Sequence, residues 1–284
     1  MGTIGRITGF IVGMSAALMA WTLENASVRV NVAANGALSA IETGSGNVFA
    51  GQTSSNVTVR DVAQPDNLTF QAVLSIDGIS YGLEIILDPS CPAFDVAITG
   101  SADANVPGDL FEFPAPIKAP SGEFRVVLPM RTGVMFTVAH SRSIENVTGY
   151  YDIFRGNGLS MPWYGMTEMT GGTGMMAIVQ TPMDAGIRVA VSGDAFEAGP
   201  YWRSVKHTFG YTRRVHYRLF SSGGYVAMCK YYRGMLEDRD AFVTLREKEE
   251  TIPDVAKLIG AMDVHFRSAQ VSCLEQLEAL GVDK

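Results

Sequence analysis

Two neighbouring aromatic residues and a carboxylate lie close together in the segment from Met161 to Glu168. Trp163 and Tyr164 are predicted to lie in a loop, with Glu168 shortly after them. An aromatic face stacks on the apolar face of a sugar ring, and a carboxylate accepts hydrogen bonds from sugar hydroxyls. The structural alternative, a domain interface or plain core, is favoured because buried aromatic side chains are common. Trp163, Tyr164 and Glu168 are therefore candidate substrate-binding residues.

A second polar pair, Asp263 and His265, flanks Val264 in a segment, residues 261–266, that is predicted to be a strand. Alternate residues of a strand point to the same face, so these two side chains would lie together. Such a pair either contacts a ligand or forms a polar layer at the end of the strand.

The remaining reactive side chains match no known site. The four histidines and three cysteines are scattered without metal-ligand spacing, so no metal or other cofactor is expected and the thiols are predicted to be free or buried. Arg213 and Arg214 face opposite sides of a predicted strand, so one is expected to pair with a buried acid and the other to reach solvent. Gly171, Gly172 and Gly174 do not form a phosphate loop, because no GK[ST] sequence follows them.

The composition describes a folded, acidic protein. The chain has 284 residues, a hydrophobic fraction of 47% and a formal net charge of −7. Enough apolar surface is present to fold, and the absence of a basic excess argues against nucleic acid as a partner.

Residues 1–20 resemble a signal peptide, with Arg6 before an apolar run from Ile7 to Ala20. The alternatives are a buried strand or helix, or a misjudged start. The run is too short for a membrane span, and no other apolar segment is long enough for one. The sequence therefore suggests a secreted or periplasmic protein, and otherwise a cytoplasmic one.

Residues 21–225 are predicted to form a large β domain. Short runs that alternate apolar and polar residues are separated by Gly, Asn, Asp and Pro, and no βαβ alternation occurs. Asn35-Gly36 predicts a hairpin turn. The predicted strands imply two packed antiparallel sheets, and the main ones are 27–32, 37–42, 57–62, 69–76, 81–87, 94–99, 123–128, 133–138, 174–180, 187–192 and 215–220.

The pattern then changes to helical spacing. Residues 226–255 are predicted to be a helical linker, with Pro253 starting a short helix. The strand at 261–266 and a helix over 271–280, capped by Gly281, form one βα unit within residues 256–284. One such unit cannot bury itself, so the sequence looks truncated.

Four stretches carry a family resemblance. They are the opening hairpin from Trp21 to Phe49, the segments 159–166 and 174–185, and Phe209-Gly-Tyr-Thr-Arg-Arg-Val-His-Tyr-Arg-Leu-Phe220. Together with the tail from Met228 to Val264, they resemble the galactose-mutarotase-like supersandwich that precedes the catalytic barrel in glycoside hydrolases of the endo-α-N-acetylgalactosaminidase type and their bacterial relatives.

The resemblance implies a β-supersandwich, a helical linker and the first βα unit of a truncated (β/α)8 barrel. It implies a non-catalytic N-terminal part of an enzyme acting on α-linked galactosides or N-acetylgalactosaminides, with the rest of the barrel as partner. The catalytic carboxylates of such barrels have no matching positions here, so no catalytic residue is assigned. Asp263 and His265 would then lie at the end of a barrel strand, where sugar contacts are made.

Two alternatives remain open at the sequence level. One is a stand-alone carbohydrate-binding module with Trp163 and Tyr164 as its platform. The other is an aldose mutarotase, which needs an acid and a base such as His140 and Glu168. Likeness of fold does not by itself carry function.

Overall fold

A computed structural model describes residues 20–43, 46–51, 57–100, 110–143, 148–156, 158–204, 208–261 and 271–281. The chain divides into two compact units, one up to Tyr231 and one from Tyr232 onward. The candidate signal segment, apart from Ala20, and residues 262–270, with Asp263 and His265, lie outside the described residues.

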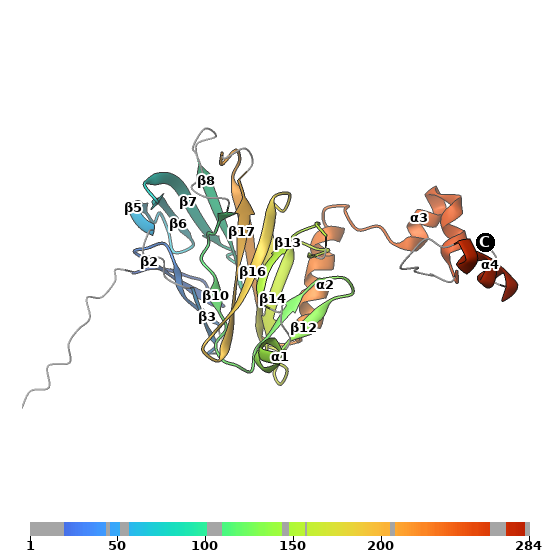
Figure 1. Cartoon of the computed structure of the whole chain (residues 1–284). Coiled ribbons are helices and arrows are strands. Elements are labelled where there is room, and N and C mark those ends of the chain that lie inside the picture. The colour runs from blue at the N-terminus through green and yellow to red at the C-terminus, as the bar shows by residue number, and fades with distance from the viewer. Residues whose placement is uncertain are drawn as a thin grey trace, which may run out of the picture. The chain divides into compact units, whose positions relative to one another are not determined.

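The first unit is mainly β and consists of two antiparallel sheets, as the sequence predicts (Figure 1). The first sheet has the strand order β1-β2-β3-β4-β10-β17-β16-β13, and β9 also pairs with β17. Its strands are β1 (Ala20–Glu24), β2 (Val28–Ala33), β3 (Leu38–Thr43), β4 (Val48–Gly51), β9 (Leu110–Phe111), β10 (Ile117–Lys118), β13 (Gly149–Asp152), β16 (Ala185–Ser192) and β17 (Ala195–Arg203).

The second sheet has the order β12-β11-β14-β15-β18-β8-β7-β6-β5. Its strands are β5 (Val57–Ala63), β6 (Thr69–Ile76), β7 (Ile79–Leu87), β8 (Ala93–Gly100), β11 (Arg125–Leu128), β12 (Val134–Phe136), β14 (Trp163–Thr167), β15 (Gly174–Val179) and β18 (Arg213–Phe220).

The hydrophobic core lies between the two sheets. In β2, Val28, Val30 and Val32 are buried while Arg29 is exposed, because successive side chains of a strand point to opposite faces. Gly36 has φ +74° in the turn between β2 and β3, a conformation that favours glycine, and the predicted Asn35-Gly36 turn is confirmed.

Helix α2 (Gly224–Glu237) lies beside the second sheet (Figure 1). Its buried Met228 packs against glycines of that sheet. A Cβ at Gly165 would collide with the Met228 sulfur, and one at Gly174 would lie 2.8 Å from its methyl group. Val127, Trp163, Met176 and Ile178 are buried although they do not belong to the core between the sheets. The short helix α1 (Val138–Ser143) follows β12.

The second unit contains helix α3 (Leu245–Thr251), the 3₁₀ helix η1 (Pro253–Leu258) and helix α4 (Val271–Ala279). Thr244 and Glu247 form a reciprocal capping box at the start of α3. The predicted helices of this region are confirmed, with Pro253 at the start of η1 and Gly281 at φ +77° after α4. A barrel unit is not shown, because the predicted strand falls almost wholly outside the described residues.

Candidate functional site

Trp163 and Tyr164 lie in strand β14, so the prediction that they lie in a loop is wrong. Their side chains point to opposite faces of the sheet and do not form one platform. Tyr164 belongs to the core between the sheets, where its hydroxyl donates to the carbonyl oxygen of Ala198 at 3.1 Å. Burial raises the pKa of Tyr164 above its ordinary value. Trp163 lies on the opposite face, where β14 pairs with Ile178 of β15.

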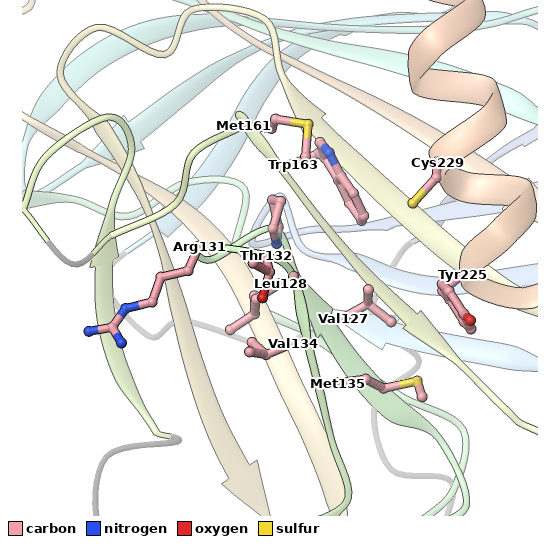
Figure 2. A pocket seen from close by; sticks show the side chains of 12 residues that line it. Val127, Leu128, Arg131, Thr132, Val134, Met135, Met161, Trp163, Tyr225 and Cys229 are labelled. Carbon is pink, nitrogen blue, oxygen red and sulfur yellow. The ribbon is translucent and has the colours of Figure 1, made fainter. Parts of the chain in front are cut away.

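Trp163 lines a cavity of about 280 Å³ that we call the indole cavity (Figure 2). Tyr225 and Cys229 of α2 line it from one side. Its other side chains are mostly apolar and include Val127, Leu128, Val134, Met135 and Met161. An apolar group fits this lining better than a sugar, because hydroxyls would lose water here and gain few hydrogen bonds.

Glu168 lies in a second hollow of about 280 Å³, lined partly by the glycines at 171–172 and 223–224. Its Oε1 accepts a hydrogen bond from the Thr173 hydroxyl at 2.5 Å, and Asn47 donates to the same hydroxyl oxygen at 3.0 Å. Tyr225 lines both this hollow and the indole cavity. The structure therefore places Trp163 and Glu168 in neighbouring cavities.

A third cavity, which we call the edge cleft, has a volume of about 910 Å³. It lies where the edge strand β13 of one sheet approaches the turn between β11 and the edge strand β12 of the other. Its lining includes Arg131, Tyr150, Tyr151, Asp152 and Arg155. Sequence reasoning missed this site, although two tyrosines, an acid and an arginine among glycines in residues 149–156 were a usable signal.

Helix α2 also covers a chain of three polar groups. Asp95 Oδ1 lies 3.0 Å from His216 Nδ1, and His216 Nε2 lies 2.7 Å from the Tyr231 hydroxyl. The His216 and Tyr231 rings stack at 5.9 Å. Burial raises the pKa of Tyr231, so its phenol stays protonated at neutral pH. This chain of groups attaches α2 to β18.

The described residues show no metal-binding cluster of three or more His, Cys, Asp or Glu side chains. Cys91 and Cys229 are free thiols, as the sequence predicts. Within the same described ranges, no helix is long and apolar enough to cross a membrane.

No family model and no curated protein matches the chain. Several solved structures do match the chain. The α-N-acetylgalactosaminidase NagBb from Bifidobacterium bifidum, in its complex with Gal-NHAc-DNJ, aligns at 16% identity and a TM-score of 0.69 over 92% of this chain and 50% of its own. Its GalNAc complex aligns at 17% identity and a TM-score of 0.68 over 93% of this chain and 50% of its own.

The chain has the fold of that half of NagBb. It spans about half the length of the enzyme that it matches. A galactose mutarotase related enzyme from Lactobacillus acidophilus also aligns, with 9% identity and a TM-score of 0.46 over 72% of this chain and 98% of its own, a likeness too distant to add to the argument.

Proposed function

We propose that this chain is the non-catalytic N-terminal part of a glycoside hydrolase that acts on α-linked galactosides or N-acetylgalactosaminides. Its role is to support the catalytic barrel and to form one side of the sugar cleft. The observation that carries the proposal is the alignment of 92–93% of the chain with half of an α-N-acetylgalactosaminidase.

The distribution of carboxylates supports a non-catalytic role. Glycoside hydrolysis uses two carboxyl groups about 5–5.5 Å apart in retaining enzymes and about 6.5–9.5 Å apart in inverting ones. Among the described residues, no acid lines the indole cavity, only Glu168 lines the second hollow, and only Asp152 lines the edge cleft. None of these cavities offers the required pair.

Under this proposal, some of the candidate residues stay proposed contacts and one does not. Glu168, Asp263 and His265 stay proposed sugar or barrel contacts, and Trp163, whose cavity has a mostly apolar lining, stays a proposed barrel contact. Tyr164 does not, because its ring is buried between the sheets and its hydroxyl already donates to Ala198.

Turnover by the purified 284-residue chain tests the proposal. The chain is incubated with an aryl α-N-acetylgalactosaminide and an aryl α-galactoside, and release of the aryl group is followed. We expect no release above the buffer rate. Release that depends on the protein and on its concentration would contradict the non-catalytic role.

A stand-alone carbohydrate-binding module is the second candidate, and the edge cleft is the observation that favours it. A stand-alone module would bind sugar without a catalytic barrel, so its native polypeptide would carry no barrel. The size of the native polypeptide therefore separates this candidate from the first.

A further inference from the structure

The edge cleft has the size and access of a ligand site. Its volume of about 910 Å³ lies within the range of about 300–1,000 Å³ for small-molecule pockets. Val134 and Arg131 line one side, and Tyr150, Asp152 and Arg155 line the other. The cleft therefore combines aromatic, anionic and cationic groups in one cavity.

The register of three strands fixes its carboxylate. Asp152 of β13 pairs with Gly186 of β16, which pairs with Tyr201 of β17. Gly186 has no side chain, so the Tyr201 ring crosses β16 and its hydroxyl donates to Asp152 Oδ1 at 2.7 Å. A Cβ at Gly186 would collide with that ring. The Tyr201 hydroxyl, two strands away, thus fixes the position of the Asp152 carboxylate.

Asp152 is ionised and still accessible. Burial raises its pKa, but hydrogen bonds from Tyr201 and Arg203, with the charges of Arg203 and Arg155, hold the pKa below the ordinary value. Arg203 Nε donates to Oδ1 at 3.1 Å, whereas its contact to Oδ2 is longer, at 3.4 Å. The carboxylate is 29% exposed, so Oδ2 can accept hydrogen bonds from a ligand.

Tyr150 provides a fixed aromatic surface beside this carboxylate. The residue is 52% exposed, yet its hydroxyl donates to Glu112 Oε1 at 2.7 Å and its ring meets Tyr201 edge to face at 5.2 Å. Holding the ring before binding lowers the entropy lost when a ligand is bound. Arg155 is exposed and adds guanidinium donors.

We propose that the edge cleft is a saccharide-binding subsite. The apolar face of a pyranose stacks on Tyr150, two neighbouring hydroxyls donate to Asp152, and Arg155 donates to a ring or hydroxyl oxygen. This inference rests on the proposed function for its ligand class and adds a site to it.

The test is a titration of the purified chain with methyl α-N-acetylgalactosaminide, methyl α-galactoside and methyl α-glucoside. Saturation-transfer NMR detects binding, and calorimetry measures it. We expect at least one galacto-configured glycoside to bind, and Tyr150→Ala to weaken its affinity about tenfold. Ile86→Ala is the control, since this exposed side chain of β7 lines none of the three cavities, and it should leave the affinity unchanged.

Two further variants separate binding from folding. Asp152→Asn keeps an acceptor for Tyr201 but removes the charge that meets Arg203, and it should lower affinity while the protein still unfolds in one cooperative transition, at a somewhat lower melting temperature. Gly186→Ala should displace Tyr201 and lower affinity as well, whereas Gly82→Ala, where a Cβ would meet only ordinary contacts, should not.

Absence of binding by all three glycosides would overturn the inference. So would binding that Tyr150→Ala and Asp152→Asn leave unchanged. Neither result bears on the supporting role, which is tested by turnover and by the size of the native polypeptide.

Discussion

Arg213 is a fully buried cation whose charge is met by Asp184. The guanidinium is 3.0 Å from Asp184 Oδ2, and the two side chains are only 2% and 6% exposed. Tyr211 also donates to Asp184, and its ring lies 3.5 Å from the Arg213 guanidinium. Arg214, the next residue, is exposed. The prediction that one arginine of this pair meets a buried acid is confirmed.

Asp184→Ala should destabilise the protein by about 3–5 kcal/mol, because it leaves the Arg213 charge buried and unpaired. Urea unfolding measures the loss. Glu24→Ala, which breaks the exposed pair with Arg29, should cost at most about 1 kcal/mol. Similar losses in the free energy of unfolding for the two variants would show that the buried pair contributes no more to stability than the exposed one.

The Asp88 carboxylate makes the stability of the protein depend on pH. Its carboxylate accepts hydrogen bonds from the backbone of Ser90 and Cys91 and from the Ser90 hydroxyl, and the pKa falls to about 2. An unfolded Asp titrates near about 3.9. The stabilisation is therefore present above about pH 4 and is lost as the pH falls through about 2.

Asp88→Asn should be less stable than the natural protein above about pH 4, and the difference should shrink as the pH falls towards 2. Melting temperatures of both proteins across this range measure it. A difference that stays constant with pH would exclude the ionised Asp88 as its source.

Among the elements, the strands with strict alternation could be predicted from sequence. β6 (Thr69–Ile76) has the predicted bounds, because one of its faces is buried and the other meets solvent. β14 is buried on both faces over all its residues, so its alternation is lost, and Pro162 and Gly165 suggested a loop.

Strand β17 (Ala195–Arg203) is not among the strands predicted from the sequence, because it too contains residues typical of a loop. Gly199-Pro200 suggests a break, since proline lacks the backbone donor of a sheet ladder. In the structure, Pro200 falls where the neighbouring strand is interrupted: β10 pairs as far as Ala198, and β9 starts opposite Trp202. Residues 149–156 signal the edge cleft in the sequence, but its geometry depends on the long-range pairing of β13, β16 and β17 and could not be predicted.

Helix α2 is held mainly by Met228, which is fully buried against glycines of β14 and β15. Met228→Ala should cost about 2–5 kcal/mol, because it leaves a cavity between helix and sheet. It should also speed hydrogen exchange in α2. Val226→Ala, at a position 44% exposed on the same helix, should change stability by no more than about 0.5 kcal/mol. Equal effects would contradict this packing.

For the whole molecule, the fold resembles part of a glycoside hydrolase, whereas the described cavities lack the carboxylate pair that hydrolysis requires. Two nine-stranded sheets pack around one hydrophobic core. Among the described residues, each of the three cavities is lined by at most one carboxylate rather than by a hydrolytic pair. Support of a barrel together with sugar contact at the surface fits both observations.

The size and activity of the native polypeptide in the source cells test this account most directly. An antibody against the 284-residue chain isolates that polypeptide, and its intact mass and its turnover of an aryl α-N-acetylgalactosaminide are measured. The account predicts a polypeptide much heavier than the 284-residue chain, with hydrolytic activity that the chain alone lacks. A native polypeptide no longer than 284 residues, or one without turnover, would contradict it.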